Sequence, residues 1–301
     1  MTDLRRGIWR LADPKITLAS AASLFLGAAA AAAHGTVAWG WLGLTVLGIF
    51  FIEVAKNASG EVFDFDSGTD LAVADEDRSP FSGGKRVLVD GLLSRRQVWW
   101  VAGVTYALGA LVGVAIAAAR EPRVLWLGLA GVACAWFYHA PPLKLSYRGF
   151  GELAVAACYG PLIAAGTYLV QRGDLHADVL LPAFPLGLAI AAFLYVNEFP
   201  DYSADRAAGK RTLVVRLGRA RASMAFTVLV AATFGGVLVL PLLGLPVAVL
   251  LGAAGAVPAV AAARRLRGSP DVTPQLVPAQ AWTLLAFVLL ASGSGLGLLI
   301  G

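Results

Sequence analysis

Hydrophobic residues along the chain are gathered into long runs that are separated by short polar stretches. Each run is roughly 20 residues long, the length at which an α-helix crosses the hydrocarbon core of a bilayer. Nine such runs cover residues 15–33, 36–56, 98–119, 123–140, 150–171, 179–197, 221–240, 244–263 and 279–300. Because lipid offers no partner to backbone N–H and C=O groups, spanning segments of this length are helical. The pattern therefore predicts an all-α, polytopic membrane protein with nine transmembrane helices.

The composition supports a membrane protein. Hydrophobic residues make up 58% of the 301 residues and charged residues 14%, whereas about 25% of the residues of a soluble domain are charged. We expect the first run to stay as a span, because no small-residue cleavage site of a signal peptide stands out. The two cysteines, Cys134 and Cys158, both lie within hydrophobic runs and predict packing rather than a disulfide framework.

Basic residues fall almost entirely on one side of the predicted membrane. When the nine runs alternate across it, every Lys and Arg except three arginines lies on the side of the N-terminus. Positive charge stays on the cytoplasmic side of membrane proteins, so we expect a cytoplasmic N-terminus. The same rule accounts for the net charge of +5 without a nucleic-acid partner. The loops on the other side are short and predict no site, and His34, His139 and His176 are too scattered in the sequence to predict a metal centre.

Two acidic stretches follow the second and sixth runs. The first, N-A-S-G-E-V-F-D-F-D-S-G-T-D, covers residues 57–70, and the second, N-E-F-P-D-Y-S-A-D, covers residues 197–205. In the second stretch Asn197, Asp201 and Asp205 stand four residues apart, on one stripe of a helix. In the first, the same helical spacing relates Glu53, Asn57, Glu61 and Asp64. Each stretch therefore predicts a row of side-chain oxygens at the cytoplasmic end of a span.

Carboxylates at the end of a membrane helix are costly unless a positive charge pairs with them. Mg²⁺ relieves their repulsion, since it takes oxygen ligands and is usually held by one or two carboxylates and the phosphates of a substrate. Basic residues near the two stretches provide partners for phosphate oxygens; they are Lys85, Arg86, Lys144, Arg148, Arg206, Lys210 and Arg211. These features together predict a divalent-metal site for a lipid-linked diphosphate.

The motifs resemble those of the UbiA superfamily of intramembrane prenyltransferases, and especially its menaquinone (MenA-like) branch. Asp201-x-x-x-Asp205 is similar to the D-x-x-x-D motif that follows span six in that family. S-G-T-D at residues 67–70 and Y-H-A-P-P-L-K-L-S-Y-R-G at residues 138–149 resemble two further family motifs. The resemblance covers nearly the whole chain and implies one UbiA-like domain over residues 1–301. It also implies that the nine helices surround a central cavity and that the protein lies in a prokaryotic cytoplasmic (inner) membrane, with its active site near the cytoplasmic face.

The resemblance implies an activity, the transfer of a polyprenyl group from a prenyl diphosphate to an aromatic acceptor with Mg²⁺ (or Mn²⁺) as cofactor. The expected acceptor is 1,4-dihydroxy-2-naphthoate in menaquinone biosynthesis, and membrane lipid surrounds the prenyl tail. The implied metal residues are Asn57, Glu61, Asp64, Asp70, Asn197, Asp201 and Asp205, of which Asp64, Asp201 and Asp205 are implied to be catalytic. The implied substrate-binding residues are Lys85, Arg86, Tyr138, His139, Lys144, Arg148, Arg206, Lys210 and Arg211.

The domain is expected to consist of pseudo-repeat halves, because four runs separate the two acidic stretches. The halves cover about 15–140 and 150–300, and cytoplasmic loops at about 57–97 and 198–220 are expected to cap the site. Such a cap would exclude water, which otherwise quenches an allylic carbocation.

Several positions depart from the family pattern. Gly60 stands where the family usually has Asn, Glu61 where it usually has Asp, and His139 in place of a small hydroxyl residue. Asn57, one helical turn before Glu61, is expected to supply the missing amide oxygen. Glu53 is a candidate for the base that takes a proton from the acceptor.

Three other functions stay open at this point. A UbiA-type terpene cyclase would direct the carbocation onto the substrate's own double bonds. A prenyltransferase with another acceptor, such as 4-hydroxybenzoate, a glycerol-phosphate lipid or phosphoribosyl diphosphate, would use the same motifs. A cation transporter also combines repeated halves with acids in its spans, although transporter sites lie near mid-membrane and these acids gather at one face.

Overall fold

The computed structural model describes residues 2–301, and in this part of the chain it contains helices and connecting loops without strands. The α-helices are α1 Asp3–Ala12, α2 Pro14–Ala33, α3 Trp39–Asp66, α4 Arg95–Ala119, α5 Val124–Phe137, α6 Gly151–Ala157, α7 Ile163–Arg172, α8 Ala177–Ala207, α9 Leu213–Leu217, α10 Arg219–Val239, α11 Ala256–Gly268 and α12 Thr273–Ile300. Short helical turns are η1 Asp75–Asp77, η2 Leu145–Tyr147, η3 Cys158–Leu162, η4 Leu240–Leu243 and η5 Val247–Gly255. The predicted all-α fold is confirmed.

Eight helical segments of the described chain are long and apolar enough to cross a membrane. The run predicted at 123–140 is shorter, because α5 has 14 residues and rises about 21 Å against a hydrocarbon core of about 30 Å. The helix ends before Pro141 and Pro142, which do not continue an α-helix. Nine full-length spans are therefore not confirmed.

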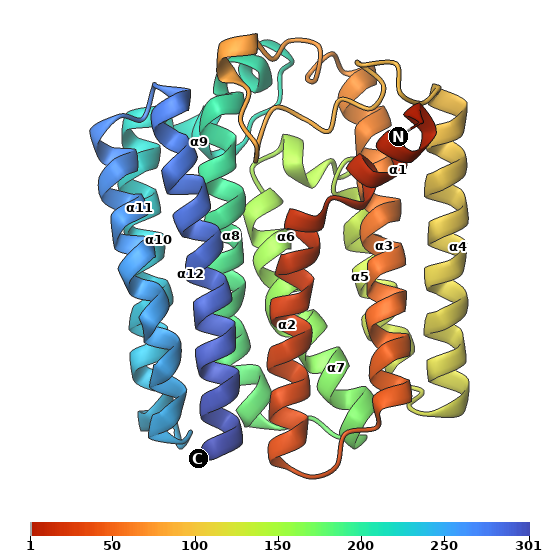
Figure 1. Cartoon of the computed structure of the whole chain (residues 1–301), viewed down its shortest axis with the longest axis vertical. Coiled ribbons are helices and arrows are strands. Elements are labelled where there is room, and N and C mark those ends of the chain that lie inside the picture. Colours follow the sequence, from red (N-terminus) through yellow and green to blue (C-terminus); the bar gives the residue numbers. More distant parts are fainter. Residues whose placement is uncertain (1) are drawn as a thin grey trace.

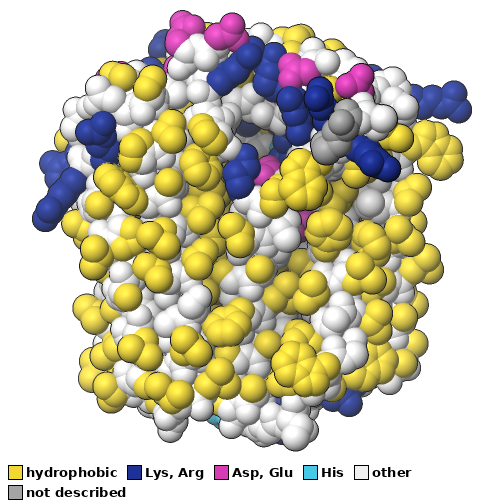
Figure 2. All heavy atoms as spheres, viewed as in Figure 1, with side chains coloured by type: hydrophobic (Ala, Val, Ile, Leu, Met, Phe, Trp, Pro, Cys, Tyr) yellow, Lys and Arg dark blue, Asp and Glu magenta, His cyan; other side chains and the backbone are white. Residues whose placement is uncertain are grey.

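The long helices lie side by side along the longest axis of the molecule, and α1 crosses the end that carries the N-terminus (Figure 1). The loop at residues 67–94 spreads over this same end, whereas the C-terminus lies at the other. Figure 2 shows Lys, Arg, Asp and Glu side chains gathered at the end with α1, above a broad hydrophobic surface. This distribution suits a molecule embedded in lipid with one polar end. The cytoplasmic placement of that end stays a prediction.

Helix α8 forms the centre of the larger hydrophobic core. It packs against α2, α6, α10 and α12, and its side chains Tyr195, Val196 and Phe199 are almost completely buried. A smaller core joins Leu11 of α1 to Val62 of α3 and to the loop at 67–94 and α4. The two helices that carry the acidic stretches, α3 and α8, are thus each anchored in their own packed core.

A single π-turn, η3, interrupts the helix formed by α6 and α7. It contains Gly160, with φ −92° and ψ −105°, and Pro161, which removes a backbone donor. The carbonyl of Tyr159 accepts a hydrogen bond from the Ser23 hydroxyl of α2. Turns of this kind are frequent at functional sites, and here Tyr159 lies in the wall of the cavity described below.

Both acidic stretches are helical over most of their length. Helix α3 continues to Asp66 and α8 to Ala207, so the connecting loops begin at residues 67 and 208 rather than at 57 and 198. The predicted cap is correspondingly shorter. The rigid helix holds Asn57, Glu61 and Asp64 in one row, whereas Asp70 lies on the loop.

Candidate metal and diphosphate site

A cavity of about 700 Å³ opens at the charged end of the molecule, between α3, α8 and the loop at 67–94. All seven predicted metal residues line it, namely Asn57, Glu61, Asp64, Asp70, Asn197, Asp201 and Asp205. Two acidic stretches that lie more than 100 residues apart in the sequence therefore line one cavity.

The row on α8 points buried oxygens at the cavity. Asp205 is 1% exposed, and Lys210 Nζ lies 3.4 Å from its Oδ1. Within residues 2–301, one oxygen of each of Asn197, Asp201 and Asn57 is buried without a hydrogen-bond partner. Buried polar oxygens are rarely left unpaired, so these atoms have the donor chemistry and the free lone pairs that a hard divalent cation takes.

The row on α3 is partly held by other elements. Tyr147 Oη donates to Asp64 Oδ1 at 2.6 Å, and the backbone N–H of Leu88 donates to Glu61 Oε1 at 2.8 Å. Asn57 Nδ2 donates to the carbonyl of Leu11 at 2.9 Å. Glu61 therefore ties the cap loop to α3 with one carboxylate oxygen.

Asp70 reaches the same cavity from the loop. A Cβ atom at Gly84 would lie 2.5 Å from Asp70 Oδ1, and Gly84 has φ +76°, so only glycine fits there without strain. Burial, together with the nearby Asp64 and Glu61, raises the pKa of Asp70 to about 8. A carboxyl group in such surroundings favours a bound cation, which supplies the missing positive charge.

Three predicted basic residues, Lys85, Arg86 and Lys210, line the cavity with Tyr138 and His139. Burial would lower the pKa of Lys210, but Asp205 and Asp64 beside it raise that pKa well above its usual value, so Lys210 is a firm positive charge. Lys85 Nζ lies 3.2 Å from Asp13 Oδ2. Burial lowers the pKa of the His139 imidazole to about 3 although Asp64 opposes the shift, so this ring is neutral.

The other four predicted substrate-binding residues, Lys144, Arg148, Arg206 and Arg211, do not line the cavity. Lys144 Nζ lies over the ring of Tyr147, 5.3 Å from its centroid. The backbone carbonyls of Arg148 and Arg211 accept hydrogen bonds from the Arg216 side chain. The side chains of Arg148, Arg206 and Arg211 are exposed.

Four further residues belong to the site although the pattern of acids did not single them out as ligands. Lys56, Asp13 and Glu198 line the cavity, and Tyr147 holds Asp64. Lys56 and Glu198 are next to Asn57 and Asn197 in the sequence, and this position could have indicated that they belong to the site. Tyr147 lies within the string at residues 138–149 that resembles a family motif, which was also a signal, whereas Asp13 comes from a distant segment and had none.

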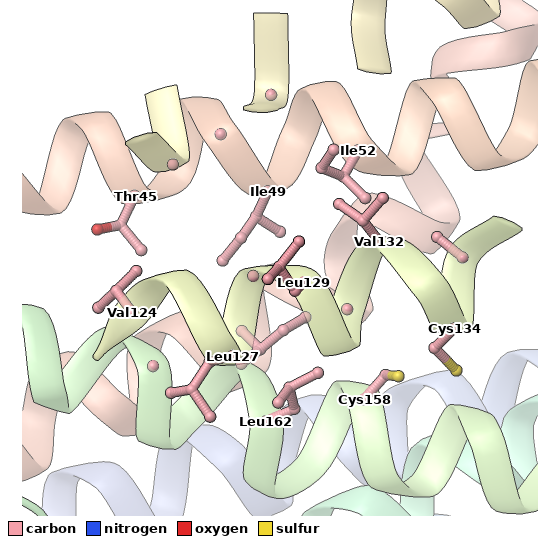
Figure 3. A pocket seen from close by; sticks show the side chains of 18 of the residues that line it. Thr45, Ile49, Ile52, Val124, Leu127, Leu129, Val132, Cys134, Cys158 and Leu162 are labelled. Atoms are coloured by element: carbon pink, nitrogen blue, oxygen red, sulfur yellow. The ribbon is translucent and has the colours of Figure 1, made fainter. Parts of the chain in front are cut away.

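A second, apolar pocket of about 330 Å³ continues from the first, and Lys56, Tyr138, Val155 and Tyr159 line both. Figure 3 shows Thr45, Ile49 and Ile52 of α3 facing side chains of α5, with Leu162 and Cys158 completing the wall. Cys134 and Cys158 are both free thiols at one end of this pocket. Glu53 also lines it and accepts a hydrogen bond from Ser20 Oγ at 3.0 Å.

A sequence profile of the UbiA prenyltransferase family matches residues 21–284. The chain belongs to this family. It is similar to the 1,4-dihydroxy-2-naphthoate octaprenyltransferase of Mycobacterium tuberculosis, at 32% identity over 221 residues that cover 73% of each protein. The corresponding protein of Bacillus subtilis is 27% identical over 211 residues, which cover 70% of this chain and 66% of that protein.

Solved structures share the fold. A UbiA homolog from Archaeoglobus fulgidus bound to GPP and Mg²⁺ has a TM-score of 0.64 and 17% identity, with 97% of this chain and 99% of that chain covered. A UbiA homolog from Aeropyrum pernix has a TM-score of 0.68 and 18% identity, with 92% and 96% covered. The expected membership of the UbiA family is confirmed.

Proposed function

We propose that this prenyltransferase moves a polyprenyl group from a prenyl diphosphate to 1,4-dihydroxy-2-naphthoate. The proposal rests on one observation: the cavity lined by both acidic rows continues into an apolar pocket. Relatives of Mycobacterium tuberculosis and Bacillus subtilis carry the name of this activity, which supports the choice of acceptor.

Asn57, Asp64, Asp70, Asn197, Asp201 and Asp205 would hold Mg²⁺, with Glu61 contributing its second oxygen. When bound, the cation neutralises the diphosphate as it leaves. Lys210 and Lys85 bind phosphate oxygens beside it, and their fixed positive charges favour the anionic leaving group in the transition state. The homolog from Archaeoglobus fulgidus bound to GPP and Mg²⁺ supports this arrangement.

The apolar pocket would take the prenyl tail, because its walls are aliphatic side chains of α3, α5 and η3. Tyr138 and Tyr159 lie where the two cavities meet. Their ring faces stabilise an allylic cation by about 0.5–2 kcal/mol each. Glu53, on the tail side of this junction, takes the proton from the acceptor ring.

Contacts that hold the loop at 67–94 over the cavity would exclude water. Arg10 Nη1 lies 2.6 Å from Asp90 Oδ2, and Thr273 Oγ1 donates to Asp77 Oδ1 at 2.9 Å. Helix α1 and helix α12 thereby hold the loop from two sides. This polar end faces the cytoplasm in the proposed topology, and the membrane is the prokaryotic inner membrane.

Incubation of the purified protein with MgCl₂, a long-chain prenyl diphosphate and one candidate acceptor at a time tests the proposal. The expected result is prenylated naphthoate, identified by mass spectrometry, with one pyrophosphate released for each product. Hydrocarbon formed without any acceptor would establish a cyclase instead. Product with 4-hydroxybenzoate but none with the naphthoate would refute the acceptor assignment.

A further inference from the structure

Three side chains meet at the end of the molecule opposite the acidic cavity. Helix α2 ends and helix α8 begins at this end (Figure 1), and the residues are His34, which follows α2, and His176 and Asp178 at the start of α8. His34 Nε2 and His176 Nδ1 each lie 3.2 Å from Asp178 Oδ2. The histidines were expected to be too scattered in the sequence to predict a metal centre, but the end of α2 lies beside the start of α8 and brings the rings of His34 and His176 to 4.7 Å between centroids.

The hydrogen bonds of His34 determine which nitrogen carries its proton. His34 Nδ1 lies 2.9 Å from the carbonyl oxygen of Ala30, and a carbonyl only accepts, so Nδ1–H is the donor. In the neutral ring Nε2 then has a free lone pair, and this is the atom that faces Asp178. The ring also stands edge-on to Tyr168, with centroids 5.8 Å apart, so its direction is held from two sides.

His176 presents a second ring nitrogen to the same carboxylate. Its Nδ1 lies 3.2 Å from Asp178 Oδ2, and it also caps α8, since the backbone nitrogen of Asp178 lies 3.4 Å away. Two imidazole nitrogens and one carboxylate oxygen therefore converge, which is the arrangement of ligand atoms that a divalent cation needs.

We propose that His34, His176 and Asp178 form a binding site for a borderline divalent cation such as Zn²⁺. One ligand atom from each residue lies within 4.8 Å of the others, and two imidazoles with one carboxylate are a ligand set that Zn²⁺ takes in proteins. The His34–Ala30 hydrogen bond is the outer contact that orients a ligating imidazole. The side chain of His176 is 50% exposed, so the site is open to water, which fills the remaining position.

Such a site joins two helices that matter to the acidic cavity. Helix α8 carries Asn197, Asp201 and Asp205 toward its other end, and α2 packs against α7 and α8. The cation would link the end of α2 to the start of α8 and stabilise the folded protein in proportion to its occupancy. The ligands of this site, two imidazoles and one carboxylate, differ from those of the acidic cavity. The possible ligand atoms in that cavity are mainly carboxylate and amide oxygens, together with the imidazole of His139.

Zn²⁺ titration of the full-length protein, stripped of metal and held in detergent with excess MgCl₂, tests the proposal. The excess Mg²⁺ is added to fill the acidic cavity, where the proposed function places it, and it competes poorly for imidazole. We expect one equivalent of Zn²⁺ per chain by calorimetry, and visible Co²⁺ absorption bands typical of nitrogen ligation. His176→Asn keeps an oxygen that caps α8 and should weaken Zn²⁺ binding by at least about 100-fold.

Two further variants separate the sites. Asp178→Asn should also lose Zn²⁺ binding and the rise in unfolding temperature that Zn²⁺ produces. His139→Ser should keep both, because His139 lies in the other cavity. Equal Zn²⁺ affinity in the wild type and in His176→Asn would overturn the proposal, as would a wild type that binds no Zn²⁺ under these conditions.

Discussion

His139 occupies the space that a side chain at position 60 would fill. A Cβ atom built on Gly60 would lie 2.5 Å from His139 Cε1 and 2.8 Å from Nδ1. The other ring nitrogen, Nε2, lies 3.6 Å from Asp64 Oδ2. Two of the positions that were expected to depart from the family pattern are thus in contact, and an imidazole from the loop after α5 fills the space beside Gly60 of α3.

This contact predicts that Gly60→Ala destabilises the protein, because an added methyl group displaces a buried ring at a cost of about 1–3 kcal/mol. The matched control is Gly103→Ala on α4, where a Cβ atom meets nothing within 4 Å and which should be neutral or stabilising. Thermal unfolding measures both. Gly60→Asn combined with His139→Ser should recover stability that Gly60→Asn alone loses, whereas additive effects would show that the two positions are independent.

The two acidic rows predict that Asp201→Asn loses prenyl transfer by about 100- to 1000-fold, the usual effect of removing one electrostatic partner of a transition state. Asp66→Asn is the matched control, because Asp66 ends the same helix as Asp64 but pairs with Arg95 at the surface, 2.7 Å away. It should stay within about threefold of the wild type, since exposed ion pairs contribute little. Steady-state rates at saturating MgCl₂ measure both, and an active Asp201→Asn would refute the metal assignment.

The place of Lys210 in the cavity wall predicts that its replacement weakens diphosphate binding. Lys210→Met should raise the inhibition constant of inorganic pyrophosphate about 10- to 100-fold, because a charged hydrogen bond worth about 1.5–3 kcal/mol is lost. Lys144→Met is the control, since Lys144 also lies over the Tyr147 ring but outside the cavity wall. Equal weakening of pyrophosphate binding by Lys144→Met and Lys210→Met would contradict this prediction. It would show that Lys144, on the loop after α5, also contacts the bound pyrophosphate.

The apolar pocket predicts a limit on prenyl length. Gly128→Phe should shift product toward shorter chains, because Gly128 lines the pocket and has open space beyond its Cα atom. Gly103→Phe, also in open space but away from the pocket, should leave chain length unchanged. Competition between short and long prenyl diphosphates, resolved by mass spectrometry, measures the effect. Unaltered selectivity in Gly128→Phe would mean that the tail leaves the site by another route.

The proposed role of Glu53 as the base predicts that its replacement slows proton removal from the acceptor. Glu53→Gln should lower kcat by about 100-fold or more, the usual contribution of a general base, and leave KM for the prenyl diphosphate unchanged. An unchanged kcat in Glu53→Gln would refute this role. A similar loss in Ser20→Ala would instead assign the effect to the hydrogen bond between Ser20 and Glu53.

Much of the architecture follows from local pattern. Long apolar runs form helices because lipid cannot satisfy backbone groups, and spacings of three and four residues place Asn57, Glu61 and Asp64 on one face of a helix. Helix ends are less predictable from such patterns. Proline shortens α5, and the two polar stretches stay helical past the ends of the spans because the smaller core and the packing of α8 hold them.

The helices, the polar end and the two rows of acids can be predicted from the amino-acid sequence, since each depends on neighbours within a few residues. Which rows meet depends on helix packing, because packing brings together residues far apart in the chain. Packing also places Tyr147 on Asp64, Lys210 beside Asp205 and His34 beside His176. The contact between Gly60 and the His139 ring also depends on packing. The two residues belong to segments far apart in the chain, so no local sequence pattern predicts that they meet.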